Sequence, residues 1–279
     1  MPKIKKQQPV AKRKKGGSVI DRIGQLGEGL DEGVKLSLYG RSGTGKTTFT
    51  SSAPKPLLYI ICSGGNRPGE MRSINTAENR KTISQVTLES STELTELVTD
   101  PSIEKYKTVI LDHASGLQDL ILKEVVGLAE IPAQLGWGVA SQQQWGQVAL
   151  QLKERLRGLL GLPQHVIVTA QEREFNTDSE SALLMPYVGS GLTPSATGWL
   201  NTAVDYICQT FIRQKTTVVE TKIGTKTTRI NKPAKGVEYC LRTGPHEVYT
   251  TKFRIPKGNP LPDEIVDPSF DKFLKLIKG

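Results

Sequence analysis

The sequence predicts an α/β fold in which a mainly parallel sheet is flanked by helices and is followed by a β-rich C-terminal part. From about residue 35 to residue 170, short apolar runs alternate with amphipathic segments of helical spacing. Runs that are apolar throughout are typical of strands buried on both faces of a parallel sheet. After residue 171 the sequence becomes polar and rich in Gly and Pro, and strand-like runs joined by short turns follow. These later runs favour antiparallel pairing.

The elements of the parallel part follow from these patterns in chain order. Strands are expected at residues 35–39, 57–61, 83–88, 108–112 and 165–170. Helices are expected from about residue 46 and over residues 90–100, 116–130 and 148–161. Pro54 and Pro56 end the first helix and Pro163 ends the last, because proline cannot continue the hydrogen-bond ladder of a helix.

The β-rich C-terminal part is expected to begin at about residue 205. Its strand-like runs are residues 204–214, 216–230, 236–244 and 249–255. A hairpin turn is expected at Gly224, and the short run 267–279 has the pattern of an amphipathic helix.

The positive charge of the chain is concentrated at its N-terminus. The formal net charge of the 279 residues is +9, and residues 1–17 carry seven Lys and Arg and no acid, so nine minus seven leaves +2 for the rest. We expect residues 1–17 to be a disordered basic tail and residues 18–279 to be one domain. The tail either grips nucleic-acid phosphates or serves only solubility or localisation.

Several classes of protein are disfavoured by composition. No apolar run is long enough to span a bilayer, and the basic N-terminus lacks the apolar stretch of a secretory signal. Cys62, Cys208 and Cys240 are spaced for neither a zinc site nor a disulfide framework. We therefore expect a cytoplasmic protein with reduced cysteines and no membrane partner.

The segment "GRSGTGKT" fits the spacing G-x-x-x-x-G-K-[ST]. Glycines let backbone amides approach an anion closely, Lys46 brings charge to the β- and γ-phosphates, and the Thr47 hydroxyl can bind Mg²⁺. The expected phosphate-loop residues are Gly40, Arg41, Ser42, Gly43, Thr44, Gly45, Lys46, Thr47 and Thr48. A glycine-rich turn that matches by chance is the alternative. Because a strand is expected before the motif and a helix after it, we expect ATP or a related nucleotide to bind here with Mg²⁺.

A phosphate loop of this kind needs a carboxylate across the site to hold Mg²⁺. Asp112 ends the apolar run "TVILD", where such an acid is expected, so Thr47 and Asp112 are the candidate metal ligands. The alternative is an ordinary acid at a strand end. His113, beside it, is interpreted as a structural neighbour.

The run "HVIVTAQE" is a buried strand that ends at Gln171 and leads into a long polar segment, and it resembles the RecA/RadA-like core. Together with "GRSGTGKTTF", "YKTVILDHASGLQD" and "QQQWGQVALQLKERLRGLL", it makes the chain similar to the phage nucleotide-binding proteins of the AAA-domain type, which include RecA-like single-strand annealing recombinases. The resemblance spans about residues 35 to 215. The Trp-containing helix is its narrower signal.

This resemblance implies a RecA-like P-loop NTPase core whose catalytic residues include Lys46, Asp112 and Gln171. In that family a glutamine at this strand end senses the γ-phosphate, and the segment after Glu172 would be a DNA-facing loop. The implied function is ATP-dependent binding of single-stranded DNA in phage-type homologous recombination or strand annealing, with ATP hydrolysis that DNA stimulates. The implied setting is a homo-oligomer, as a filament or ring, in the cytoplasm of a bacterial host.

The chain departs from this family at the residue that activates water. RecA-like ATPases usually carry a glutamate just after the second strand, but here that strand runs into "CSGGNRPGE", with no acid before Glu70. Either Glu70 is the catalytic carboxylate, or hydrolysis is slow. Arg213 and Lys215 are candidates for a cation donated to a neighbouring subunit, with surface residues as the alternative.

Aromatic residues and competing functions leave further alternatives open. The three Trp residues could stack on bases or pack in a core or interface, and packing is favoured for Trp145; they are Trp137, Trp145 and Trp199. A small-molecule P-loop kinase is one alternative function, although a kinase should show an arginine-bearing lid rather than a basic hairpin from Lys215 to Lys235. A nucleotide-binding accessory protein with little turnover is another.

Removal of residues 1–17 is expected to weaken DNA binding and leave basal ATP hydrolysis unchanged. Basic residues that contact phosphates release counterions, so the truncated chain should show a shallower slope of log K against log salt concentration than the full chain. Fluorescence anisotropy with a labelled DNA across a salt series measures this slope. Equal slopes for the two proteins would mean that the tail does not touch DNA.

Overall fold

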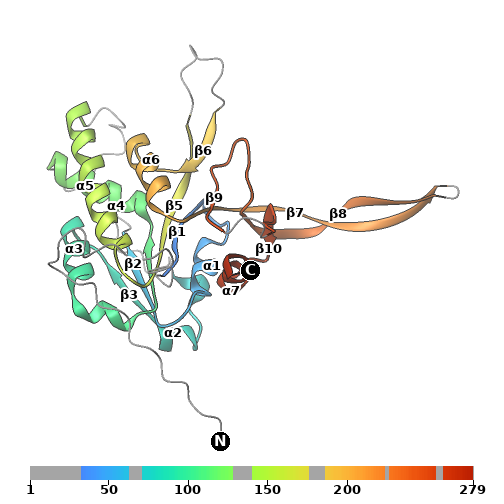
Figure 1. The fold of residues 1–279 in the computed structure, drawn as a ribbon, viewed down its shortest axis with the longest axis horizontal. Coiled ribbons are helices and arrows are strands. Elements are labelled where there is room, and N and C mark those ends of the chain that lie inside the picture. Colours follow the sequence, from blue (N-terminus) through green and yellow to red (C-terminus); the bar gives the residue numbers. More distant parts are fainter. Residues whose placement is uncertain are drawn as a thin grey trace, which may run out of the picture. The chain divides into compact units, whose positions relative to one another are not determined.

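The computed structural model describes residues 33–62, 71–127, 140–175, 186–223, 226–255 and 260–278. They belong to one compact unit, residues 33–279 (Figure 1). The expected basic tail, residues 1–17, lies outside the described residues. No helix in the described part of the chain is both long and apolar enough to cross a membrane.

The expected parallel strands form the centre of one large sheet. They are β1 (Lys35–Gly40), β2 (Leu57–Ile61), β3 (Ile83–Thr87), β4 (Thr108–Asp112) and β5 (His165–Phe175). The order across this part of the sheet is β1-β5-β4-β2-β3, and each neighbouring pair is parallel. The prediction of a mixed α/β fold with a mainly parallel sheet is therefore confirmed.

Strand β5 takes a position that its place in the chain does not suggest. It is the last of the five in sequence, yet it lies between β1 and β4. In this register Gly40 is opposite Gln171, and Leu111 is opposite Val168. The carboxyl ends of β1, β4 and β5 consequently meet at one edge of the sheet, where ligands of open α/β sheets bind.

The sheet continues beyond β1 into the β-rich C-terminal part. Its strands are β7 (Tyr206–Ile223), β8 (Lys226–Arg242), β9 (Lys252–Phe253) and β10 (Glu264–Val266). Strand β7 pairs parallel to β1 and antiparallel to β8, which pairs antiparallel to β10. The runs expected as separate strands at 216–230 and 236–244 prove to belong to two long strands, which flank the expected turn at Gly224. That turn lies outside the described residues.

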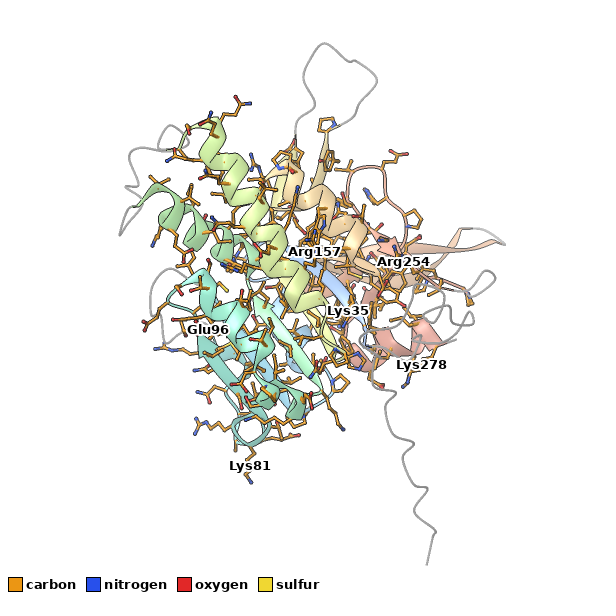
Figure 2. The ribbon with its side chains drawn as sticks, turned by 60° about the vertical axis from the view of Figure 1, so that its left-hand side comes forward. Lys35, Lys81, Glu96, Arg157, Arg254 and Lys278 are labelled. Atoms are coloured by element: carbon orange, nitrogen blue, oxygen red, sulfur yellow. The ribbon has the colours of Figure 1, made fainter. Side chains whose placement is uncertain are left out.

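Two layers of helices cover the sheet. The helices are α1 (Lys46–Ser51), α2 (Asn79–Thr82), α3 (Ser91–Thr99), α4 (Ala114–Val126), α5 (Gln142–Leu160), α6 (Pro194–Ala203) and α7 (Phe270–Lys278). Short 3₁₀ helices span Arg72–Ile74 and Pro101–Lys105. Helices α3, α4, α5 and α6 pack on one face, whereas α1 and α7 pack on the other (Figures 1 and 2).

The continuous apolar runs of the strands are explained by these two layers. In β5, Val166 and Val168 point into the core under α3 to α6, and Ile167 points into the core under α1 and α7. All three side chains have no exposed surface. These residues of β5 are thus buried on both faces of the sheet. A strand buried on both faces is apolar throughout and does not alternate between apolar and polar residues.

Helices α5 and α6 show how local signals set helix ends. Helix α5 begins six residues before the expected start, because Ser141 and Gln144 form a reciprocal capping box. Helix α6 was not expected, although Thr193 before Pro194 is a typical start signal, since proline suits the first helical position. Trp145 on α5 and Trp199 on α6 pack against the core, so packing is the role that the structure gives them.

The three cysteines are free and buried. Burial raises the pKa of the thiols of Cys62 and Cys208, which keeps them neutral at physiological pH. They therefore behave as small apolar core residues.

Helix α7 packs against α1, the helix that follows the phosphate loop. Its side chains Phe270 and Phe273 have no exposed surface and lie against Phe49 of α1, with ring centroids 6.0 and 6.2 Å from that of Phe49. The expected amphipathic helix at 267–279 is thus confirmed, with bounds Phe270–Lys278.

Replacement of Phe273 by Ala is expected to lower the free energy of unfolding by about 3–5 kcal/mol, because it removes a fully buried ring and leaves a cavity. Urea denaturation followed by circular dichroism measures the change. Lys275→Ala is the control, since the Lys275 side chain is 75% exposed and pairs only with Asp271 on the same helix. A loss below about 1 kcal/mol for Phe273→Ala would mean that α7 does not contribute to the stability of this core.

Candidate nucleotide-binding site

The expected phosphate loop connects the end of β1 to the start of α1. Gly43 and Gly45 have positive φ angles of 80° and 90°. Residues with a Cβ atom rarely adopt this conformation, so the loop requires glycine at both positions. The chain then enters helix α1 at Lys46, as the motif predicts.

Strand β7 supports the loop from the side. A Cβ atom on Gly40 would lie 2.4 Å from the backbone oxygen of Thr210, so only glycine lets the two segments approach this closely. The hydroxyl oxygens of Thr44 and Thr210 are 2.7 Å apart. The loop is therefore fixed by a strand that follows it by more than 160 residues.

Lys46 is buried at the centre of the site. Its Nζ donates hydrogen bonds to the backbone oxygens of Gly40 and Arg41, at 2.7 and 2.9 Å. Burial lowers the pKa of the ammonium, and the nearby carboxylates of Asp112 and Glu172 act in the opposite direction. A phosphate in the loop would supply a charged acceptor for this ammonium, which has only neutral hydrogen-bond partners here.

A cavity of about 440 Å³ lies over the loop and brings the main predicted residues together. Its lining residues are Ser42, Gly43, Gly45, Lys46, Thr47, Thr48, Ser73, Asp112, His113, Gln171 and Tyr239. The predicted loop residues Arg41 and Thr44 instead line a neighbouring cavity of about 210 Å³. Gly40 lines neither cavity and acts through its close approach to β7.

Asp112 is positioned at the end of β4 by a neighbouring strand. Its Oδ1 accepts a hydrogen bond of 2.7 Å from the Thr169 hydroxyl on β5. Asp112 and Thr47 line the same cavity and offer the oxygen ligands that Mg²⁺ prefers. Among the described residues no group of three or more His, Cys, Asp and Glu could hold a metal ion alone. The oxygens of Thr47 and Asp112 suit a Mg²⁺ ion that would take its other ligands from phosphates and water.

His113 caps the next helix. Its Nδ1 accepts a 2.9 Å hydrogen bond from the backbone amide of Gly116, at the start of α4. The interpretation of His113 as a structural neighbour fits this bond, although its ring also lines the cavity.

Gln171 lines the cavity from β5, between the strands that carry the phosphate loop and Asp112. Its backbone is held on both sides: its amide donates to the Ser115 hydroxyl at 3.3 Å, and its oxygen accepts from the amide of Gly191 at 2.7 Å. The Ser115 hydroxyl in turn donates to the backbone oxygen of Gly191 at 3.0 Å. Gln171 therefore connects the cavity to the start of α4 and to the residues after β6.

The expectation that a loop begins at Glu172 is wrong. Strand β5 continues to Phe175 and pairs antiparallel with β6 (Tyr187–Ser190). The rings of Phe175 and Tyr187 stack with centroids 4.9 Å apart, which stabilises the cross-strand pair. Residues 176–185, between these strands, lie outside the described residues.

Glu172 is a residue of the site region that sequence reasoning missed. It accepts hydrogen bonds from Arg41 Nε at 3.1 Å and Gln209 Nε2 at 2.9 Å, and Arg242 Nε donates to Gln209 at 3.0 Å. This chain of contacts joins the phosphate loop to β5, β7 and β8. The alternation of side chains along β5 could have indicated the position of Glu172. Neighbouring residues of a strand point to opposite faces of the sheet, so Glu172 points to the face opposite that of Gln171.

Tyr239 was also missed. Its ring lies over the loop, with Cδ1 3.2 Å from the position of a Cβ atom on Gly45, and 44% of the residue is exposed. No local pattern distinguishes this tyrosine, because its place depends on how β8 pairs with β7.

Of the remaining predicted catalytic groups, Arg213 and Lys215 do not line this cavity. Glu70 lies outside the described residues. Arg213 is bound to Glu238 at 3.1 Å and to Glu264, so the nearby carboxylates are its partners within the chain. Lys215 is exposed on β7. For both basic residues, the surface interpretation fits these positions.

Comparison with curated protein sequences finds no match. Among solved structures, the chain is similar to the flagellar accessory protein FlaH from Methanocaldococcus jannaschii, with 12% identity, 85% of each chain covered and a TM-score of 0.43. It is also similar to a KaiC-like protein from Pyrococcus horikoshii OT3, with 13% identity, 75% of this chain and 85% of the other covered, and a TM-score of 0.38.

A family model gives the assignment. The model described as an AAA domain matches residues 32–255. The matched range contains the phosphate loop, Asp112 and Gln171, together with the strands that position them. Since the match covers most of the 279 residues, the chain belongs to the AAA domain family of P-loop NTPases.

Proposed function

We propose that the protein is an ATP-dependent single-stranded DNA-binding protein that acts in phage-type homologous recombination or strand annealing. In this proposal it hydrolyses ATP, DNA stimulates the hydrolysis, and the chain works as a homo-oligomer in the cytoplasm of a bacterial host. The observation that carries the proposal is the position of Gln171, which lines the phosphate cavity. The strand continues directly from Gln171 into residues 172–175, which pair with residues 187–190 of β6. We call this antiparallel pair the β5–β6 excursion.

The nucleotide half of the proposal is supported by the composition of the cavity. Lys46 would hold the β- and γ-phosphates, and Thr47 with Asp112 would hold Mg²⁺. The bound nucleotide would supply the phosphoryl group whose transfer to water these residues stabilise. The described residues contribute positioning and charge, which are the principal means of catalysis in phosphoryl transfer.

The DNA half is supported by the path from the cavity to the excursion. A γ-phosphate contact by the Gln171 side chain would act on a backbone that Ser115 and Gly191 hold on both sides. Residues 172–175 continue the same strand, so a shift of Gln171 reaches β6 without a flexible joint. The DNA contacts would lie at the end of this excursion, and occupancy of either site would favour the same arrangement.

A second candidate function has a specific observation in its favour. Asp112 is the one carboxylate that lines the cavity in the described part of the chain. An NTPase without a second acid to activate water would bind nucleotide and turn it over slowly, which describes an accessory protein. Glu70 is our candidate for that second acid. A turnover assay with and without single-stranded DNA separates the two functions, because DNA stimulation supports recombination and tight binding without turnover supports the accessory role.

Lys46→Ala is expected to weaken ATP binding by about 10- to 100-fold, because a charged hydrogen bond to phosphate contributes about 1.5–3 kcal/mol. Equilibrium titration with a fluorescent ATP analogue measures the affinity, and thermal unfolding monitors the fold. Lys81→Ala is the matched control, since Lys81 is exposed on α2 and is absent from the cavity. Unchanged affinity in Lys46→Ala would remove the phosphate-binding assignment.

Gln171→Ala is expected to reduce the dependence of DNA binding on nucleotide more than it reduces either affinity alone. The measurement is a cycle: affinity for a single-stranded oligonucleotide is determined with and without a non-hydrolysable ATP analogue, for wild type and variant. Coupling is reciprocal, so DNA must tighten binding of the analogue by the same factor. Gln143→Ala, at an exposed position of α5, is the control.

Two outcomes of this cycle contradict the proposal. A wild-type ratio of one would mean that the two sites are not coupled. A wild-type ratio that survives in Gln171→Ala would make this residue a structural strand end rather than a sensor.

A further inference from the structure

Strands β7 and β8 extend well beyond the sheet to which they belong. The last residue of β7 that pairs with β1 is Gln209, and the outermost residue of β8 that pairs with β10 is Cys240. Farther out, the two strands pair only with each other, as far as Ile223 and Lys226. We call residues 213–238 the ribbon, and Figure 1 shows its strands reaching away from the sheet. At about 3.3 Å per residue, its β7 side spans about 35 Å.

The ribbon carries an excess of positive charge that the body of the protein lacks. Residues 213–238 contain seven Lys and Arg against two Glu, a net charge of +5. The whole chain carries +9, and residues 1–17 account for +7 of it. The remaining residues, 18–212 and 239–279, therefore sum to −3. Outside the N-terminal segment, positive charge is thus concentrated on one projecting element, which is typical of a surface for a polyanion.

The lysines near the base of the ribbon are available for such a partner. Lys215, Lys232 and Lys235 are exposed, and none forms a salt bridge with another described residue. Arg213 differs, because it is bound to Glu238 and Glu264. This arginine ties the base of the ribbon to β10 and leaves the lysines beyond it to face solvent.

The shape and composition of the ribbon favour one class of polyanion. A two-stranded antiparallel ribbon fits the major groove of B-form DNA, which is about 12 Å wide, whereas the major groove of duplex RNA is too narrow. Between Phe211 and Tyr239 the sequence has no aromatic residue. Proteins that bind single strands gain affinity from bases stacked on aromatic side chains, and this ribbon has no aromatic side chain for such stacking. Lysine and threonine side chains, which contact phosphates, are abundant instead.

We propose that the ribbon is a duplex-DNA-binding arm whose lysines contact the phosphates that border the major groove. The arm is a second nucleic-acid site, separate from the single-strand site proposed at the end of the β5–β6 excursion. It would hold a duplex beside a strand bound elsewhere on the protein, and its phosphate contacts would be independent of base sequence.

The test uses the full chain and the triple variant Lys215→Gln, Lys232→Gln, Lys235→Gln. Binding of a fluorescein-labelled 30-base-pair DNA of mixed sequence is followed by anisotropy between 50 and 200 mM salt, without nucleotide. Each lost phosphate contact lowers the slope of log K against log salt by about 0.9, so the slope should fall by about 2.7 and the affinity should drop throughout the range. Single-stranded DNA and duplex RNA of the same sequence are measured in parallel, and both should change less.

The matched control removes the same charge elsewhere, in Lys81→Gln, Lys105→Gln, Lys107→Gln. These lysines are exposed, and Lys81 lies on α2, away from the ribbon (Figure 2). The control should keep the wild-type slope. If both variants lost the same amount of duplex-DNA affinity and slope, the loss would come from the change in net charge rather than from the ribbon, and the proposal would be overturned.

Two further results would also overturn it: an unchanged duplex slope in the ribbon variant, or a loss confined to single-stranded DNA. Unchanged thermal unfolding and ATP-analogue binding confirm that the ribbon variant is folded. The nucleotide dependence of single-strand binding, which we assign to Gln171, should be unchanged in this variant. The experiment therefore distinguishes a failure of the duplex-DNA arm from a failure of the proposed function.

Discussion

The insertion of β5 between β1 and β4 is the constraint on which the candidate site depends. Parallel backbone pairing brings the ends of these three strands to one edge, so the phosphate loop, Asp112 and Gln171 line a single cavity. Each comes from a different part of the chain and has no local interaction that would hold it beside the others. The pairing also lets the Thr169 hydroxyl of β5 orient the Asp112 carboxylate of β4. A one-residue shift in the register of β5 would move each of its side chains to the opposite face and disturb both close-packed cores, so packing holds these strand ends in place.

The C-terminal strands complete the site from the other side. Thr210 of β7 supports the start of the phosphate loop, and the ring of Tyr239 on β8 lies over Gly45. The contacts of Glu172 with Arg41 and Gln209 join this support to β5. Both flanks of the loop are thus held by strands rather than by mobile loops, which favours a preformed phosphate site. The same two strands then leave the sheet as the basic ribbon, so one pair of strands supports the nucleotide pocket and also carries the exposed lysines Lys215, Lys232 and Lys235.

The distribution of charge suggests how two kinds of anion are kept apart. The cavity holds one buried ammonium, at Lys46, beside the carboxylate of Asp112, which suits a compact phosphate with a divalent cation. The ribbon instead holds exposed lysines near its base, at Lys215, Lys232 and Lys235, which suits a long polyanion whose binding weakens with salt. Buried charge is little screened, and exposed charge is strongly screened, so salt should affect the two sites differently.

The sequence by itself determined the phosphate loop and the mixed α/β fold class. Strands β2 and β4 have the expected bounds, because a buried strand and a glycine-rich loop are both specified by adjacent residues. Only the tertiary structure decided the position of β5 in the sheet, its continuation to Phe175, and the place of Tyr239 over the loop. These features arise from backbone pairing and packing between residues far apart in the chain. Apolar periodicity records that a strand is buried, but it does not record which strand lies beside it.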